Sequence, residues 1–448
     1  MRVNLMSDAT SMAEDFASGR SDPVQALEQA LDHASRAAAV FITLTADRAR
    51  REAEAAAARW RAGQPLSVFD GVPLAWKDLF DVAGSVTTAG AAYRRDAPAA
   101  LLDAPSVGLL CRAGMVSVGK TNLSELAYSG LGLNPHFGTP HNPHGRDQSR
   151  IPGGSSSGSA VAVAAGIVPI AMGTDTAGSI RIPAAFNGLV GYRSSSRRYS
   201  RDGVFPLART LDSLGPLTRS VRDALAIDDL LNGRRQTHRA RSLKGLRLVL
   251  EQRLLDDVQP AVRNNLLRAV EQLNAAGALI DVRPCATFQA TLELIQQQGW
   301  LGAFEAFALH EALLDSPDAA RLDPRVRRRL EAARSLPASR LLQLIDARRR
   351  LQQQLVDELD GALLITPTVA HVAPALAALE VDDERFASTN LATLRLTMPG
   401  SLLDMPGVTL PSGCDALGLP TGLLLSAPTG EDARLLRAAL SVESQLTI

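Results

Sequence analysis

The amino-acid sequence predicts an α/β protein with helices on both faces of a sheet. Two observations predict this class. Short aliphatic runs alternate with helical segments after residue 220, and 46% of the 448 residues are apolar, which is ample for a substantial core. The strands expected in this half of the chain are residues 246–250, 279–282, 363–365 and 423–426.

The first half of the chain divides into shorter segments. Residues 23–62 are rich in Ala, Glu and Arg and predict helices that begin at Pro23 and end at Gly63. Residues 71–77 predict a buried strand that ends on Lys77. The elements expected next are a helix at 105–114, a strand at 116–118, a helix at 122–129, a helix that opens at 153–159 and ends at Gly166, and a strand at 169–172. The best candidate for a linker is 233–244, although a surface loop within one domain fits as well.

The charge balance excludes the simplest case for nucleic-acid binding. The chain has 47 basic and 47 acidic side chains, so its formal charge is zero and no basic face is implied. Two local basic runs, at 325–329 and 348–350, lie in Ala/Leu-rich helical patterns flanked by acidic residues. We interpret both as solvated helix faces rather than as sites for an anionic partner.

Cysteine usage and hydropathy indicate a soluble cytoplasmic protein. The chain has three cysteines, Cys111, Cys285 and Cys414. They are widely spaced and form no CxxC pair, so we expect no disulfide framework and no metal cluster. Asp8 and Glu14 interrupt the N-terminus before a signal peptide could form. The longest apolar run, 160–172, is shorter than a membrane span and contains Gly166 and Pro169.

Two turns of small residues carry the candidate chemistry. Residues 153–159 read Gly-Gly-Ser-Ser-Ser-Gly-Ser, and residues 173–179 read Gly-Thr-Asp-Thr-Ala-Gly-Ser. Small residues allow the backbone to approach a ligand, and converging N–H groups form an anion hole suited to the oxyanion of acyl transfer. Ser155 and Ser179 are the candidate hydroxyl groups in these turns.

A serine nucleophile needs a base, and neither turn contains a histidine. Lys77 is the better candidate, because a lysine at the end of an apolar strand is partly desolvated and desolvation lowers its pKa. Taken separately, each signal has a plainer interpretation. The Gly/Ser segments also fit a flexible loop, and Lys77 also fits a solvated strand end.

Residues 153–184 resemble the signature of the amidase signature family, and Ser155 and Ser179 are 24 positions apart (179 − 155), as that pattern requires. Further segments resemble the same family: GVPLAWKDLFDVAG at 71–84, GKTNLSELAYSG at 119–130, FGTPHNP at 137–143, LDSLGPLTRSVRDA at 211–224, ITPT at 365–368 and, more weakly, residues 418–436. The resemblance implies a single large α/β/α domain, with a mixed twisted sheet covered by helices on both faces. Its expected parts are N-terminal helices (1–66), a catalytic core (67–228), a variable, mainly helical substrate-side region (229–360) and the C-terminal part of the core (361–448).

The resemblance also implies roles for individual residues. Ser179 is the acylated nucleophile, and Ser155, after a cis peptide bond from Gly154, bridges it to Lys77. The other implied roles are an oxyanion hole formed by the N–H groups of Thr176, Ala177, Gly178 and Ser179, a structural pair of Asp175 and Arg181, and substrate contacts from Ser129 and Gly130. The family usually has glycine where this chain has Ala177, and a methyl group is tolerable there unless the residue needs a positive φ. Residues 192–195, Tyr-Arg-Ser-Ser, also depart from the family pattern.

The implied activity is hydrolysis of a small-molecule carboxamide to a carboxylate and ammonia, with no cofactor, no metal, no nucleic acid and no membrane. We expect the acyl pocket between the 126–134 loop and helices within 290–350. Arg193 and His136 could meet an anionic substrate, but we expect both at the surface. The sequence leaves open which amide is the substrate and whether the chain forms a homodimer.

Three alternatives remain. Residues 154–158 also match G-x-S-x-G, which would make Ser156 the nucleophile of an α/β-hydrolase-type esterase, with His238, His310 or His371 as its base. The segment before this turn does not read as the buried strand that such a turn should follow. A second alternative is a transamidase component similar to the A subunit of glutamyl-tRNA amidotransferase. The third is a binding protein on an inactive hydrolase fold.

Overall fold

The computed structural model describes residues 7–234 and 238–447, whose strands form one 11-stranded sheet. The strands are β1 (Phe41–Leu44), β2 (Pro73–Lys77), β3 (Val116–Thr121), β4 (Ile170–Asp175), β5 (Val190–Arg193), β6 (Ser213–Thr218), β7 (Arg247–Glu251), β8 (Leu279–Arg283), β9 (Leu363–Pro367), β10 (Gly407–Cys414) and β11 (Pro420–Ser426). Their order across the sheet is β1-β3-β2-β4-β6-β5-β10-β11-β9-β7-β8. The sheet is mixed, because β2 runs parallel to β3 and β4, and β7 parallel to β8 and β9, whereas the other pairs are antiparallel.

Helices cover the sheet. They are α1 (Ala9–Ala17), α2 (Pro23–Arg36), α3 (Ala46–Arg61), α4 (Pro105–Arg112), α5 (Ser157–Ala164), α6 (Arg181–Phe186), α7 (Val221–Leu231), α8 (Pro260–Ala275), α9 (Ala286–Gln298), α10 (Leu301–Leu314), α11 (Pro324–Glu331), α12 (Ala338–Leu359), α13 (Ala377–Val381), α14 (Asp383–Leu394), α15 (Met398–Leu402) and α16 (Asp432–Glu443). Short 3-10 turns are η1 (Ala92–Arg94), η2 (Glu125–Ala127), η3 (Gln252–Asp257) and η4 (Pro317–Arg321). Within the described ranges, none of these helices combines the length and apolar character that crossing a membrane requires.

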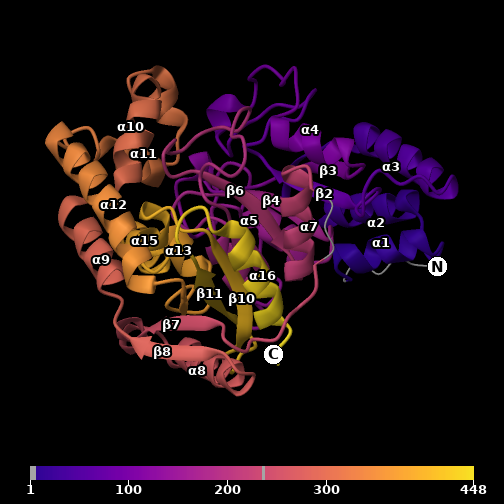
Figure 1. The fold of residues 1–448 in the computed structure, drawn as a ribbon. Coiled ribbons are helices and arrows are strands. Elements are labelled where there is room, and N and C mark those ends of the chain that lie inside the picture. The colour runs from indigo at the N-terminus through magenta and orange to yellow at the C-terminus, as the bar shows by residue number, and fades with distance from the viewer. Residues whose placement is uncertain (1–6, 235–237, 448) are drawn as a thin grey trace.

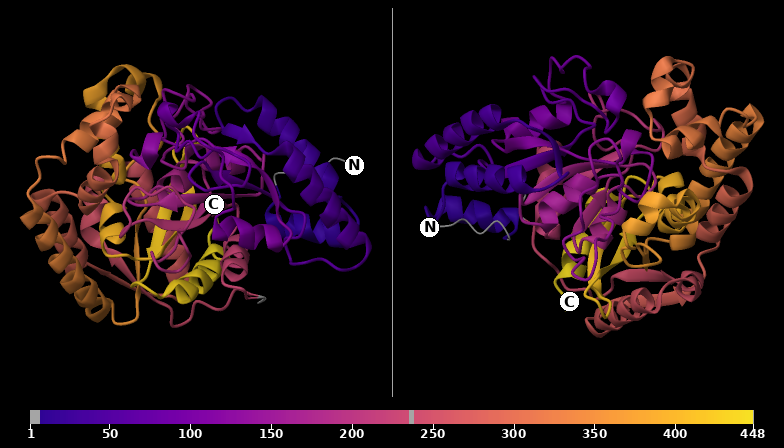
Figure 2. Two further views of the ribbon diagram at one scale, coloured as in Figure 1. Left: turned by 90° about the horizontal axis from the view of Figure 1, so that it is seen from above. Right: turned by 180° about the vertical axis from the view of Figure 1, so that it is seen from behind.

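Alternate residues of a strand face opposite layers, and both layers of this sheet are apolar. In β2, Leu74 and Trp76 pack in the cluster built from α1, α4, α7, α8 and α16, whereas Ala75 packs in the cluster built from α2, α3 and α5. Helices α1 to α3 lie at one end of the molecule and α9 to α12 at the other (Figure 1). Figure 2 shows the same separation between the indigo and the orange segments in two further views. The predicted α/β fold with one large mixed sheet covered on both faces is confirmed.

Most predicted strands are confirmed. The expected strands at 71–77, 116–118, 169–172, 246–250, 279–282, 363–365 and 423–426 correspond to β2, β3, β4, β7, β8, β9 and β11, and the helix at 105–114 corresponds to α4. The linker candidate 233–244 connects α7 to β7, and both β6 before it and β7 after it belong to the same sheet; residues 235–237 lie outside the described residues.

Two predictions are wrong in their details. Residues 122–129 are not a helix, because Leu126 (φ 51°) and Ala127 (φ 59°) adopt left-handed backbone conformations and only the short turn η2 remains. Residues 23–62 are not helical throughout, since β1 separates α2 from α3 and pairs antiparallel with β3 at the sheet edge. The run Phe41-Ile42-Thr43-Leu44 carries the β-branched signal that predicts such a strand.

Candidate active site

Strand β2 brings Lys77 into the interior. The side chain is fully buried, and it lies two residues beyond Ala75, on the sheet face that carries α5. Its Nζ donates to the Ser155 Oγ and to the Thr174 Oγ1, each at 2.7 Å. Burial lowers the pKa of Lys77 from its ordinary value of 10.5 to about 7, although the Asp175 and Asp212 carboxylates act in the opposite direction. A large fraction of this amine is therefore neutral near pH 7.

Ser155 occupies the turn that precedes α5, and its hydroxyl is buried. The peptide bond between Gly154 and Ser155 is cis. Gly154 donates its N–H to the Gly130 carbonyl at 2.7 Å, and a Cβ on Gly154 would lie 2.6 Å from the Gly132 nitrogen. The close approach of these backbones requires glycine at position 154.

Ser179 lies in the turn between β4 and α6 and is 4% exposed. Its carbonyl accepts the Ser156 N–H at 3.2 Å, and this hydrogen bond joins the two Gly/Ser turns. Within the described part of the chain Lys77 makes no hydrogen bond to Ser179, so Ser155 is the hydroxyl that the lysine contacts directly.

The N–H groups around Ser179 divide into bound and free ones. Gly178 was expected in the oxyanion hole, and this expectation is wrong, because its N–H donates to the Asp175 Oδ1 at 2.8 Å. The N–H groups of Thr176, Ala177 and Ser179 donate to no acceptor among the described residues. Ala177 has no positive φ, so its methyl group is tolerated, whereas Gly178 (φ +137°) has a conformation that side chains rarely adopt.

A buried ion network supports the turn that carries Ser179. The Asp175 Oδ1 lies 2.9 Å from the Arg181 Nη2, and its Oδ2 accepts from the Ile180 N–H at 3.1 Å. Arg193 donates to the Asp175 carbonyl and lies 3.4 Å from its Oδ1. Burial alone would raise the pKa of Asp175, but the two guanidiniums outweigh it and hold this pKa well below its ordinary value.

The structure also places Arg193 and His136, which were both expected at the surface. Arg193 is not at the surface, since its side chain is fully buried against Asp175. His136 is partly exposed, with its Nε2 3.0 Å from the Glu125 carboxylate, and it does not line the pocket at Ser179.

A pocket of about 360 Å³ opens above Ser179. It is lined by residues of three regions: the 127–129 loop and the turn at 176–179, the segment 300–303 with α11, and α14 with Met398. Of the two residues expected to contact the substrate, Ser129 lines the pocket and Gly130 does not; the Gly130 N–H donates to the Asn390 Oδ1 at 2.8 Å. The sequence reasoning missed α14, although Phe386, Asn390 and Leu394 repeat at helical spacing and mark the face that lines the pocket.

The basic run at 325–329 is not simply a solvated face. Arg325, Arg328 and Arg329 line the pocket that holds Ser179, whereas Arg327 is exposed outside it; Arg328 is exposed as well, at the pocket rim. Helical spacing explains the division, since residues 325, 328 and 329 share one side of α11.

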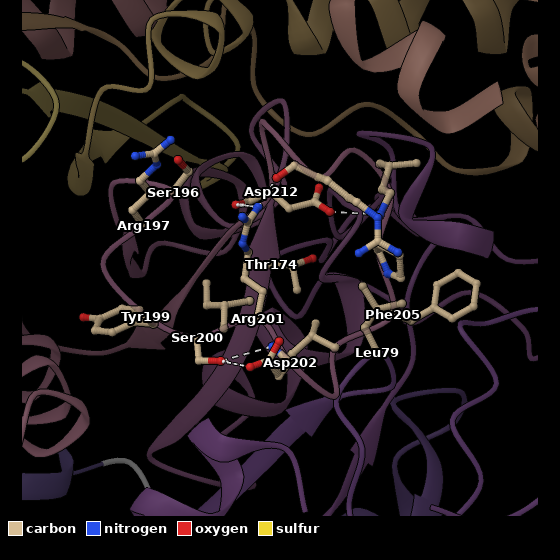
Figure 3. Close-up of a pocket in the computed structure, with 15 residues that line it drawn as sticks. Leu79, Thr174, Ser196, Arg197, Tyr199, Ser200, Arg201, Asp202, Phe205 and Asp212 are labelled. Carbon is tan, nitrogen blue, oxygen red and sulfur yellow. Dashed lines mark hydrogen bonds between the residues drawn. The ribbon is translucent and has the colours of Figure 1, made fainter. Parts of the chain in front are cut away.

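A second cavity of about 370 Å³ is lined by Thr174 and Asp212 (Figure 3). The Thr174 hydroxyl accepts from Lys77. The Asp212 carboxylate accepts from the Thr176 hydroxyl at 2.6 Å, so this cavity also borders the turn at 176–179. Leu207 lines both cavities.

The histidines give no support to the Ser156 alternative. The Ser156 Oγ is buried and donates to the Thr174 carbonyl at 3.3 Å. His238 pairs with Asp229 at 2.6 Å, His310 stacks on Phe205, and His371 contacts Thr393. Within residues 7–234 and 238–447, no three His, Cys, Asp or Glu side chains gather as metal ligands would.

Comparisons with known proteins agree with this geometry. The family model described as Amidase matches residues 23–436. The 2-amino-5-chloromuconic acid deaminase of Comamonas testosteroni is 34% identical over 406 residues, which cover 89% of this chain and 86% of that protein. The A subunit of the glutamyl-tRNA(Gln) amidotransferase from Symbiobacterium thermophilum is 32% identical, covering 97% and 96%. A solved structure described as an amidase is 34% identical with a TM-score of 0.87, covering 98% of this chain and 100% of that one. The chain therefore belongs to the amidase family of enzymes, which act on amide C–N bonds.

Proposed function

We propose that the chain hydrolyses a small-molecule carboxamide to a carboxylate and ammonia through an acyl-enzyme on Ser179. The observation that carries this proposal is the buried contact of 2.7 Å between the Lys77 amine and Ser155, at the turn bonded to the Ser179 backbone. The relative from Comamonas testosteroni, which is named for a small organic acid, supports a substrate of similar size.

In the proposed mechanism, the Ser179 Oγ attacks the amide carbonyl. Its proton passes to Ser155 while the Ser155 proton passes to the neutral Lys77. The N–H groups of Thr176, Ala177 and Ser179 bind the oxyanion. When the tetrahedral intermediate collapses, the proton returns along the same path to the nitrogen, and ammonia leaves. Water then attacks the acyl carbon while its proton passes through Ser155 to Lys77. As the bond between the acyl carbon and the Ser179 Oγ breaks, this proton passes back through Ser155 to the Ser179 Oγ, so the acid is released and Ser179 and the neutral Lys77 are restored.

The proposal predicts a pH dependence of acylation. Lys77 accepts a proton only when neutral, and its neutral fraction rises as the pH rises through its pKa of about 7. We expect kcat/KM to increase about tenfold per pH unit below about pH 6 and to level off above about pH 8. The measurement is the initial rate of ammonia release between pH 5 and 9. A rate that still rises about tenfold per pH unit between pH 8 and 9 would mean that the base has the ordinary lysine pKa.

The test of the function is ammonia release from a panel of aliphatic, aryl and dicarboxylic amides by the chain alone. We expect at least one amide to be hydrolysed, and the Ser179→Ala variant to lose this activity. Release by Ser179→Ala at the wild-type rate would contradict the assignment of the nucleophile.

A second candidate function is transamidation, which the glutamyl-tRNA(Gln) amidotransferase relative favours. In that case ammonia would pass to an aminoacyl-tRNA and only when a partner protein is added. Amide hydrolysis by the chain alone favours the first function over this one.

We also propose a cytoplasmic location, because the three cysteines are unpaired and a reducing compartment suits them.

A further inference from the structure

The pocket above Ser179 is positively charged. Its lining includes three guanidiniums, those of Arg325, Arg328 and Arg329, and the carboxylates that pair with them are Asp323 and Asp383, which leaves a net charge of +1 (3 − 2). The rest of its lining is neutral, and mostly small or apolar. An uncompensated charge in a partly desolvated pocket favours an anionic ligand.

The three arginines differ in their partners. Arg325 lies 3.0 Å from the Asp323 carboxylate, and its guanidinium stacks over the Phe386 ring. Arg328 lies 3.2 Å from Asp383, and the arginine side chain is 67% exposed. Both therefore have a counter-ion within the protein.

Arg329 has none among the described residues. Its guanidinium lies 4.2 Å above the centre of the Tyr128 ring and donates one hydrogen bond to the Tyr128 carbonyl. Burial lowers the pKa of Arg329, which indicates that desolvation of this cation is not compensated by a neighbouring charge. A guanidinium has five N–H donors in a planar fork, so most of its donors stay available to a ligand.

Asn390 adds a neutral donor to the same pocket. Its Oδ1 accepts from the Gly130 N–H at 2.8 Å and from the Ser129 hydroxyl at 3.1 Å. These two donors fix the orientation of the amide, and its Nδ2 donates to no acceptor among the described residues. A carboxylate needs several donors, and an arginine fork with a nearby amide N–H supplies them.

We propose that the amide substrate carries a carboxylate group and that Arg329 binds this carboxylate while the scissile amide lies at Ser179. The inference rests on the proposed function and narrows its substrate to amides of dicarboxylic acids or of similar acidic compounds.

The test compares matched substrates. Succinamate, glutaramate and adipamate are monoamides with a terminal carboxylate, and butanamide, pentanamide and hexanamide carry a methyl group in its place. We expect wild-type kcat/KM to be higher for at least one acidic amide than for its neutral partner. The Arg329→Gln variant should reduce this preference on the order of 10- to 100-fold, because it removes charge-assisted hydrogen bonds. Arg329→Lys should retain part of the preference, since it keeps the charge but loses the fork.

The matched control is Arg327→Gln, which changes an exposed arginine of the same helix outside the pocket and should keep the full preference. The readout is a ratio within each variant, so a loss of folded protein in Arg329→Gln lowers both rates and leaves the ratio interpretable. Wild-type enzyme without the preference, or an unchanged ratio in Arg329→Gln, would overturn the inference, while Ser179-dependent hydrolysis of neutral amides would still uphold the proposed function.

Failure of the proposed function gives a different result. If no amide of either kind is hydrolysed, calorimetric titration of the same monoamides into Ser179→Ala decides the anion site separately. Tighter binding of an acidic amide that disappears in Ser179→Ala/Arg329→Gln would support the site, and equal binding of acidic and neutral amides would overturn it.

Discussion

Replacing Lys77 by alanine is expected to slow acylation of Ser179 by about 10²–10⁴-fold, the usual contribution of a general base. The physical reason is the direct contact at 2.7 Å between the Lys77 amine and the Ser155 hydroxyl, together with a pKa of about 7 that makes the amine a proton acceptor. The measurement is the rate of acylation by an activated ester or a fluorophosphonate, with circular dichroism to show that the variant is folded.

Two further variants separate the base from a mere positive charge. Lys77→Arg keeps a cation at the site, but arginine is not deprotonated in proteins, so this variant should be as slow as Lys77→Ala. The control is Lys244→Ala, which removes an exposed lysine distant in sequence from Lys77. This variant should be acylated at the wild-type rate. Fast acylation by Lys77→Arg would show that proton transfer to position 77 is not required.

Replacing Asp175 by asparagine is expected to lower the free energy of unfolding by about 3–5 kcal/mol, since it removes the carboxylate that pairs with the buried Arg181 and leaves the buried Arg193 with Asp404, 3.5 Å away, as its counter-ion. The Arg181 and Arg193 side chains are 1% and 0% exposed, so water cannot solvate them in its place. The measurement is denaturation by urea, followed by circular dichroism. Acylation should also slow, because the Asp175 carboxylate accepts from the Gly178 and Ile180 N–H groups that shape the turn.

The control for this prediction is Asp318→Asn. Asp318 pairs with Arg321 at 3.0 Å, and both side chains are 47% exposed, so breaking this pair should cost less than about 1 kcal/mol. If Asp175→Asn lowered the free energy of unfolding no more than Asp318→Asn does, the ion network would not be what stabilises the turn that carries Ser179.

The parts of the site that could be predicted from the sequence are those encoded locally. An apolar run that ends on Lys77 predicts a buried strand, and the two Gly/Ser turns predict close backbone approach. Neither prediction depends on residues elsewhere in the chain. Basic-residue usage offers a further signal, because only three of the 47 basic residues are lysines: Lys77, Lys120 and Lys244. Lys77 and Lys120 both lie buried near the end of a strand, but Lys120 pairs with the Asp78 carboxylate at 2.6 Å, whereas Lys77 contacts hydroxyl groups, as a proton acceptor must.

The remaining features depend on distant partners. The burial of Arg193 requires Asp175, which lies on another strand. The left-handed conformations of Leu126 and Ala127, which end the expected helix, accompany a hydrogen bond from the Leu126 N–H to the Ala89 carbonyl. The pocket position of Arg329 likewise depends on Tyr128, which lies 201 positions earlier in the chain.

The site of covalent labelling tests the central claim most directly. Wild-type protein is treated with a fluorophosphonate, digested with trypsin and analysed by fragmentation mass spectrometry. Fragmentation is needed because residues 151–181 form one tryptic peptide that contains Ser155, Ser156 and Ser179. We expect the adduct on Ser179 and no labelling of Ser179→Ala, and an adduct on Ser156 would contradict the account.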